Sequence, residues 1–311
     1  MKPLVHWGGK HRILIVDDEP DIQTVTKLSL KGLTRKCGPI EFLYASSARE
    51  ALQQLEQYPD IGVILLDVVM ETDTAGLDLC AAIRGELGNP LVRILLRTGQ
   101  PGIAPEQHTI DTYDIDGYLA KTETSSARLY TAVRCALKSF QELVTLERHR
   151  AYLSAVHECA VVLNADLGVE FMLRLVLETV MSISRAPLVV LEMETFDQGL
   201  GPRRISMHLT SDGNGTDTAQ AVEAARSRVQ QANSSSRVNG ATLLDNGFLI
   251  PLIVHRELGH GWIYVDGAVP DDLARKTLTL LAGHAQNAIY GSIALAGSRD
   301  RKTTVFEELS I

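Results

Sequence analysis

Two groups of carboxylates in this chain could bind a cation. Asp17, Asp18 and Glu19 are consecutive, and they end an apolar run. Asp67 is the one charged residue in a second apolar run, 63–70. Carboxylates that gather at one place repel one another unless a cation neutralises them, and a site built only of oxygen ligands suits Mg²⁺. The sequence therefore predicts a magnesium site, provided that the fold brings both groups together.

A hydroxyl group and an ammonium group follow later in the chain in a similar setting. Thr98, beside Gly99, ends the apolar run that begins at Arg93, and Lys121 ends a short segment that begins at Asp116. The carboxyl ends of parallel strands meet at the same edge of a sheet, where open α/β sheets place their ligands. If these runs are parallel strands, acids, hydroxyl and lysine converge on one site. The alternative is an Asp67 that only caps a turn, among ordinary strand-end residues of another doubly wound protein.

The segments around these residues alternate between strand and helix patterns. Short apolar runs rich in Val and Ile are typical of strands buried on both faces of a parallel sheet. The predicted order is a strand from Arg12, a helix 20–32, a strand 41–45, a helix 48–57, the central strand 63–70, a helix 77–86, and strands 93–98 and 116–121. The helix before the last strand falls in 100–113, where two prolines and a glycine weaken it. This alternation predicts an α/β, (βα)5 doubly wound parallel sheet.

The order and types of these residues resemble the receiver domain of two-component response regulators, a flavodoxin-like fold, over residues 10–138. The resemblance implies that Asp67 is the phosphoacceptor. It also implies that Asp17, Asp18 and Asp67 bind Mg²⁺, together with the backbone carbonyl of Val69.

The same resemblance implies roles for three further residues. Thr98 would hydrogen-bond a phosphoryl oxygen, Lys121 would form an ion pair with it, and Tyr118 would change rotamer on phosphorylation. Phosphoryl transfer to a carboxylate needs charge neutralisation more than proton transfer, which a Mg²⁺ ion and a lysine supply. The implied partner is a histidine kinase or a phosphotransfer protein. The family's usual proline after the lysine is replaced by Thr122, which leaves the geometry of this last loop open.

Two other functions are open at this stage. Asp67 could be the nucleophile of a phosphatase, but hydrolases of the haloacid dehalogenase type have a second Asp two residues on, where this chain has Val69. The chain could also be a scaffold that keeps the fold and works without phosphorylation.

A long helix is predicted to follow, because no helix breaker occurs between Ser125 and Gly168. Its apolar residues have the spacing of a coiled-coil seam, which predicts a signalling helix over 125–165 that pairs in a homodimer. The seam residues are Leu129, Val133, Ala136, Phe140 and Leu143, and then Leu153, Val156, Ala160 and Leu163. The alternative is two amphipathic helices that pack within one monomer.

The segment 166–296 has the pattern helix, strands, helix, hairpin, helix, and 297–311 is a short tail. The predicted elements are helix 169–184, strands 188–193 and 203–209, helix 218–232, a hairpin 248–255/260–266 and helix 271–296. This α+β pattern resembles a GAF domain, used for dimerisation or for sensing a ligand. Receiver, helix and GAF-like domain together resemble the amino-terminal half of response regulators that contain cyclic di-GMP phosphodiesterase or cyclase domains.

No GGDEF, EAL or paired HD and GYP motif is present, so the chain is predicted to have no catalytic output domain. It would act through a downstream protein partner, or be the regulatory portion of a longer enzyme that metabolises cyclic di-GMP. A net charge of −8 argues against a nucleic-acid surface. Four scattered cysteines and the lack of an 18-residue apolar run predict a cytoplasmic protein without a membrane segment.

Overall fold

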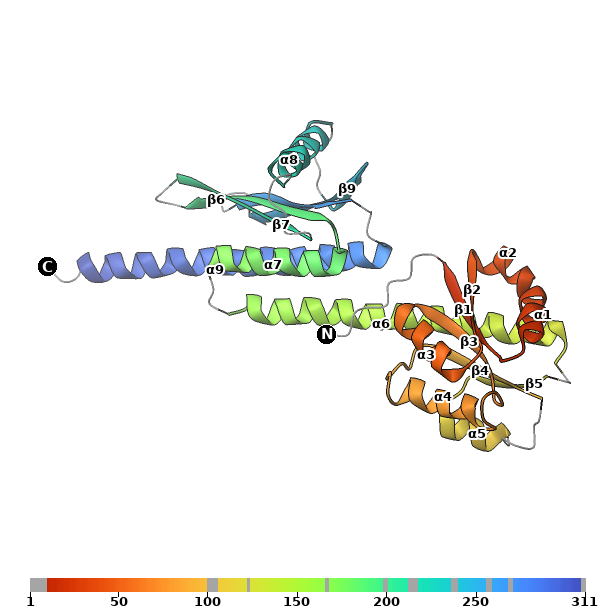
Figure 1. Cartoon of the computed structure of the whole chain (residues 1–311). Coiled ribbons are helices and arrows are strands. Elements are labelled where there is room, and N and C mark those ends of the chain that lie inside the picture. Colours follow the sequence, from red (N-terminus) through yellow and green to blue (C-terminus); the bar gives the residue numbers. More distant parts are fainter. Residues whose placement is uncertain are drawn as a thin grey trace. The chain divides into compact units, whose positions relative to one another are not determined.

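The computed structural model describes residues 10–99, 106–121, 124–165, 168–197, 201–211, 218–235, 240–255, 259–267 and 271–308. The chain divides into two compact units, Met1–Arg148 and His149–Ile311. Each unit is built on its own five-stranded sheet (Figure 1). None of the helices in the described part of the chain combines the length and the apolar character that a membrane span needs.

The first unit contains a parallel sheet of strand order β2-β1-β3-β4-β5. Its elements are β1 (His11–Val16), α1 (Pro20–Leu30), the 3₁₀ turn η1 (Lys31–Leu33), α2 (Thr34–Cys37), β2 (Ile40–Ala45), α3 (Ala48–Gln57), β3 (Ile61–Asp67), α4 (Ala75–Arg84), β4 (Arg93–Thr98), α5 (Glu106–Tyr113), β5 (Gly117–Ala120) and α6 (Ser126–Leu163). The predicted α/β alternation and flavodoxin-like order are confirmed for this unit. Apolar side chains form one core between the sheet, α3, α4 and α5, and a second core between the sheet, α1 and α6.

The central strand differs from its predicted bounds in a way that matters for the site. β3 is buried along its whole length and ends at Asp67, so Val68, Val69 and Met70 lie beyond the strand. The chain turns there because the Val68 carbonyl accepts a hydrogen bond from the amide of Gly76 at 3.0 Å. A carboxylate thus stands at the carboxyl end of a fully buried strand, the edge where open α/β sheets place their ligands.

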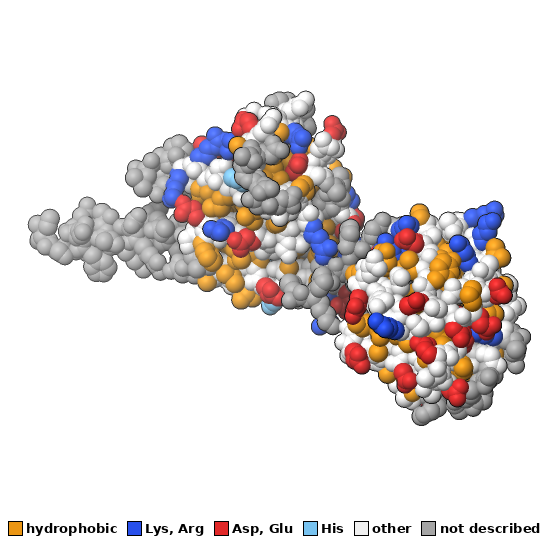
Figure 2. All heavy atoms as spheres, viewed as in Figure 1, with side chains coloured by type: hydrophobic (Ala, Val, Ile, Leu, Met, Phe, Trp, Pro, Cys, Tyr) orange, Lys and Arg blue, Asp and Glu red, His pale blue; other side chains and the backbone are white. Residues whose placement is uncertain are grey.

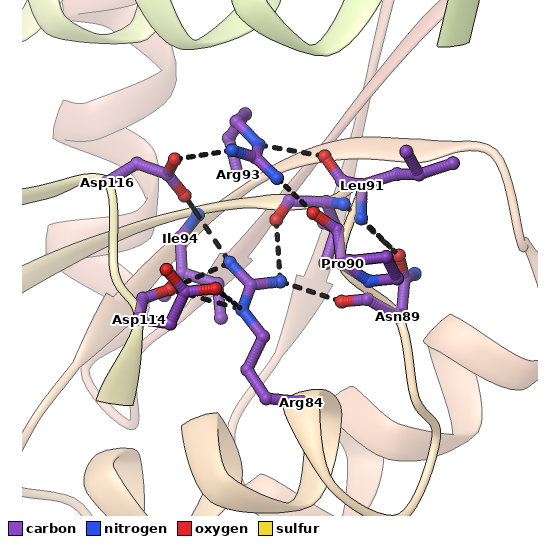
Figure 3. Close-up of polar contacts among 9 residues, drawn as sticks. Arg84, Asn89, Pro90, Leu91, Arg93, Ile94, Asp114 and Asp116 are labelled. Carbon is purple, nitrogen blue, oxygen red and sulfur yellow. Dashed lines mark hydrogen bonds and ion pairs between the residues drawn. The ribbon is translucent and has the colours of Figure 1, made fainter. Parts of the chain in front are cut away.

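A network of charged residues at the opposite edge of the sheet sets the register of β4 and β5 (Figure 3). Arg84 on α4 donates hydrogen bonds to the carbonyls of Asn89 and Val92, at 2.7 and 2.9 Å, and to the carbonyl of Asp114. Asp116 accepts a hydrogen bond from the Ile94 amide at 2.8 Å and forms an ion pair with the first residue of β4. These contacts fix where β4 and β5 begin, and therefore where their carboxyl ends lie.

Helix α6 is continuous, but the first part of its predicted coiled-coil seam faces inward. Leu129, Val133, Ala136 and Phe140 are all at most 5% exposed and pack within the first unit. The interpretation of these four residues as a seam between two chains is wrong. A helix that covers a sheet and a helix in a coiled coil share nearly the same apolar spacing, so the sequence does not separate them.

In the second unit, the later residues of the predicted seam divide between two faces of α6. Val156 and Leu163 are buried together with Tyr152 and Cys159, whereas Leu153 is 61% exposed. Cys159 forms a hydrogen bond with Thr179 of α7 (Val169–Ser184), so this part of α6 packs against α7. One side of α6 packs inside the second unit, and Leu153 on an adjacent side is exposed to solvent.

The second unit is an antiparallel sheet of order β7-β6-β10-β9-β8 with helices on both faces (Figure 1). Besides α7, its elements are β6 (Leu188–Asp197), β7 (Gly201–Thr210), α8 (Thr218–Ser235), β8 (Thr242–Leu244), β9 (Gly247–His255), β10 (Gly259–Asp266) and α9 (Asp272–Glu308). α7 and α9 lie together on one face, and α8 covers the other. The predicted hairpin of β9 and β10 is present, and α9 continues beyond its predicted end at 296.

Gly62 and Phe140 provide a test of how tightly α6 packs on β3. A methyl group added to Gly62 would lie 2.7 Å from the buried ring of Phe140. We expect Gly62→Ala to lower the free energy of opening of β3 and the first half of α6 by about 1–3 kcal/mol, measured by hydrogen exchange of peptides from both elements. Gly32→Ala, whose added methyl would meet only ordinary contact at 3.5 Å, is the control. Equal protection in the two variants would contradict this packing.

Candidate functional site

The carboxyl ends of four parallel strands bring the predicted residues to one edge of the sheet. Val16 pairs with Leu66, so Asp17 follows β1 next to Asp67 at the end of β3. Thr98, the last residue of β4, pairs with Ala120, so Lys121 follows β5 beside it. The backbone amide of Lys121 donates to the Thr98 carbonyl at 2.7 Å.

Lys121 connects the two acidic groups directly. Its Nζ lies 2.6 Å from Oδ2 of Asp67 and 2.9 Å from Oδ2 of Asp17. Oε1 of Glu19 is 3.9 Å from the same nitrogen. An ammonium group has three N–H donors, and here it bridges carboxylates that come from strands far apart in sequence.

Backbone groups orient both buried carboxylates. Asp17 is 2% exposed and Asp67 is 5% exposed. Oδ1 of Asp67 accepts a hydrogen bond from the Val68 amide at 2.8 Å, which leaves Oδ2 for Lys121. Oδ1 of Asp17 accepts from the Glu19 amide at 3.1 Å, and the Gln23 side chain donates to the Asp17 carbonyl at 2.7 Å. The acids are therefore held in place before any ligand binds.

The carboxylates of Asp17, Asp18 and Glu19 form a cluster in which one oxygen from each lies within 4.8 Å of the others. Asp17 is buried, whereas Asp18 and Glu19 are exposed. A hard divalent cation such as Mg²⁺ takes carboxylate oxygens and keeps several waters, so one buried and two exposed acids fit it. The carbonyl of Val69 as a further ligand stays a prediction.

Thr98 is the last residue of β4, and Tyr118 lies in β5, the two strands that follow β3 in the sheet. The Thr98 side chain is fully buried. Tyr118 is half-buried and packs against the apolar core between the sheet and helices α3, α4 and α5. Val69 and Met70 pack against the same core. The positions of both residues are compatible with the predicted switch, and their roles stay predictions.

The electrostatics of the site follow from its burial. Burial raises the pKa of Asp67, the negative charge of Asp17 raises it further, and the hydrogen bond and charge of Lys121 oppose this rise. Burial alone would lower the pKa of Lys121, but its hydrogen bonds to Asp67 and Asp17 raise it overall. Lys121 therefore stays charged at neutral pH. The ionised form of Asp67 is less favourable than that of an exposed carboxyl group, because its pKa is raised overall.

The sequence reasoning missed three residues that shape this edge. Glu19 is not among the predicted ligands of the metal site, although it belongs to the acidic cluster. Arg97 precedes Thr98 and was not singled out. Gly76 lets α4 approach the strand end, because an added Cβ would lie 2.0 Å from the Asp67 carbonyl oxygen. In the sequence, Gly76 is only a glycine near the start of a predicted helix. Such glycines are common, so its close approach to Asp67 is recognised only from the structure.

The raised pKa of Asp67 predicts a pH-dependent effect on the free energy of unfolding. A carboxyl group whose pKa is raised by folding costs stability as pH rises through that pKa. Without Mg²⁺, we expect Asp67→Asn to be more stable than the wild type at pH 7, and the difference to shrink as pH falls toward the ordinary carboxyl pKa of ~4. Urea denaturation at several pH values measures this. Asp73→Asn, at an exposed loop position, is the control, and a difference that stays constant with pH would contradict the account.

Comparisons with known proteins bear on the first unit. The response regulator receiver domain model matches residues 13–134. The 3'3'-cGAMP-specific phosphodiesterase 2 of Vibrio cholerae serotype O1 (strain ATCC 39315 / El Tor Inaba N16961) is 40% identical over 148 residues, which cover 48% of this chain and 28% of that protein. The matched stretch thus spans less than a third of that relative's length.

Solved structures similar to this chain include a response regulator receiver domain protein from Clostridium thermocellum. It is 24% identical with a TM-score of 0.37, and the match covers 43% of this chain and 98% of that one. A signal receiver domain of an HD domain-containing protein from Pseudomonas fluorescens Pf-5 is 24% identical with a TM-score of 0.38, covering 44% and 93%.

The family match contains nearly the whole parallel sheet, and Asp67 lies at the end of its central strand. We conclude that residues 13–134 of this chain are a response regulator receiver domain.

Proposed function

We propose that Asp67 accepts a phosphoryl group from a histidine kinase or phosphotransfer protein in a Mg²⁺-dependent reaction. The observation that carries this proposal is the Lys121 ammonium, 2.6 Å from Asp67 and 2.9 Å from Asp17, beside the cluster of three acids. A buried carboxylate with a fixed cation beside it can act as the nucleophile while charge develops on the phosphoryl oxygens.

Each of these residues has a separate role in the proposed reaction. Asp17, Asp18 and Asp67, with the Val69 carbonyl, would hold Mg²⁺, which when bound neutralises charge on the transferring phosphoryl group. An oxygen of Asp67 forms the new bond to phosphorus as the bond to the donor nitrogen breaks. Because Lys121 has three N–H donors, it can remain near Asp67 and donate to a phosphoryl oxygen.

A local change at Thr98 and Tyr118 would report this event. The phosphoryl group adds negative charge and acceptor oxygens at the strand edge. Thr98 would donate its hydroxyl hydrogen to one of them, and Tyr118 would move inward against the core it shares with α5. Its half-buried position against the same apolar core as Ile110 and Tyr113 of α5 supports this role.

We propose that the signal leaves through α6 to a homodimer formed with the second unit. Leu146 and Leu153 are each 61% exposed and seven residues apart, so they lie on the same side of the helix. We assign the second unit as a GAF-like dimerisation or sensor module, on the basis of its antiparallel sheet between α8 and the α7–α9 pair.

A second function, as the regulatory portion of a longer enzyme that metabolises cyclic dinucleotides, is favoured by the phosphodiesterase relative from Vibrio cholerae. In that case the same receiver would control a catalytic domain outside the 28% of that relative which the match covers. Nucleic acid is not the proposed partner: on the face seen in Figure 2, basic side chains are interspersed with acidic ones.

Phosphorylation by a small donor tests the proposed function. With acetyl phosphate and Mg²⁺, we expect about one base-labile phosphoryl group per chain, because an aspartyl phosphate is an acyl phosphate. Removal of Mg²⁺ by a chelator, or Asp67→Asn, is expected to abolish the incorporation, measured by gel mobility shift and by intact mass. Asp73→Asn, which removes an exposed carboxylate six positions along the chain, should leave it unchanged. Incorporation that persists in Asp67→Asn would refute the assignment.

The proposed dimer predicts a change in assembly. We expect multi-angle light scattering to give a dimer mass for the phosphorylated or BeF₃⁻-bound protein, and Leu153→Glu to shift it toward the monomer. The reason is that a charge replaces an exposed apolar side chain within the interface. Glu158→Arg, at an exposed position on the same helix, is the control for a change of charge alone. A monomer in every state would contradict the dimer, and an unchanged Leu153→Glu dimer would exclude this surface.

A further inference from the structure

Arg97 is the register partner of Asp67 in the parallel sheet. Register partners on adjacent strands direct their side chains to the same face, so both lie on the α1 side at the carboxyl edge. The Arg97 carbonyl also accepts a hydrogen bond from the amide of Val68, the residue that follows Asp67, at 3.2 Å. The backbone of Arg97 in β4 therefore holds the chain directly after the acceptor.

The Arg97 side chain lies in a buried polar setting beneath α1. Its Nη1 donates to Oγ1 of Thr26 at 2.5 Å, and Thr26 is 1% exposed. Its Nε is buried and has no hydrogen-bond partner within the described part of the chain. A partly buried guanidinium whose Nε has no acceptor costs free energy unless negative charge lies nearby to offset it.

The negative charge that offsets Arg97 comes from the acceptor site. The guanidinium interacts electrostatically with Asp17 and Asp67, which partly compensates the lowering of its pKa by burial. None of the ion pairs among the described residues includes Arg97, so it influences the carboxylates through space without occupying their ligand atoms. An arginine keeps its charge under these conditions.

Counting formal charges shows what Arg97 adds. Asp17, Asp18, Glu19 and Asp67 carry four negative charges, and Lys121 returns one. With Arg97 the site has two unbalanced negative charges, which a divalent cation would neutralise; without it, the site would attract a cation more strongly and repel an incoming phosphoryl group.

We infer that Arg97 is a second fixed positive charge of the acceptor site, which weakens the binding of the divalent cation and strengthens the binding of the phosphoryl group. This inference rests on the proposed function of Asp67. Its specific consequence is that removal of the charge changes the two affinities in opposite directions, which a purely structural role of the side chain would not do.

Binding of Mg²⁺ alone, and of BeF₃⁻ at saturating Mg²⁺, to the full chain tests the inference by titration calorimetry. A unit charge several ångströms from a divalent ion in a partly solvated site corresponds to roughly a fivefold effect on affinity. We therefore expect Arg97→Gln to bind Mg²⁺ about fivefold more tightly and BeF₃⁻ about two- to threefold more weakly. Arg97→Lys, which keeps the charge, is expected to retain both wild-type affinities.

Two controls separate charge from packing. Thr26→Val removes the hydroxyl that Arg97 contacts but no charge, and Arg35→Gln removes the same charge at an exposed position on α2. Both should leave the two affinities near those of the wild type. Weaker binding of both ligands by Arg97→Gln, or a Mg²⁺ affinity changed as much by Thr26→Val or Arg35→Gln, would overturn the inference. Failure of the wild-type chain to bind BeF₃⁻ with Mg²⁺ would instead overturn the proposed function, and the inference with it.

Discussion

The ammonium group of Lys121, held between two buried carboxylates, is the interaction on which the receiver site depends. Asp17 and Asp67 come from neighbouring strands and would repel each other, because both carboxylates are almost completely removed from water. The ion pairs at 2.6 and 2.9 Å make this arrangement possible without a metal. They also leave the site ready for a stronger cation. Among the described ion pairs, the exposed Asp18 takes part in none, and the exposed Glu19 has only the 3.9 Å contact with Lys121.

The rest of the first unit serves to hold these strand ends in register. At the far edge of the sheet, Arg84 and Asp116 fix where β4 and β5 begin. At the near edge, Gly76 allows α4 to start directly against the Asp67 backbone. On the other face of the sheet, the first half of α6 forms part of the core. A change in the packing of that core would therefore act on α6, whose residues from His149 onward belong to the second unit.

The sequence was sufficient for the parallel sheet and for the placement of Asp17, Asp67 and Lys121. Short, fully apolar runs rich in Val and Ile are typical of buried parallel strands, and a lone acid in such a run is costly unless it lies at the strand's end. The antiparallel hairpin of β9 and β10 was also predictable, because two β-rich runs flank a short turn.

Other features depend on tertiary contacts that spacing does not encode. The same 4-3 spacing that suggested a seam between two chains instead placed Leu129 and Val133 in the core of their own unit. Arg97 looks like an ordinary charged residue in an apolar strand, and its meaning comes from its register with Asp67 and its contact with Thr26. Gly76 likewise acquires its role only when the end of β3 is seen beneath it.

The most direct test of the central claim is to identify the residue that carries the phosphoryl group. The chain would be incubated with acetyl phosphate and Mg²⁺, reduced with borohydride, which converts an aspartyl phosphate to homoserine, and mapped by peptide mass spectrometry. The account predicts homoserine at position 67 and a strict requirement for Mg²⁺. Modification at another carboxylate, or an unmodified Asp67 under conditions in which the protein is folded, would contradict it.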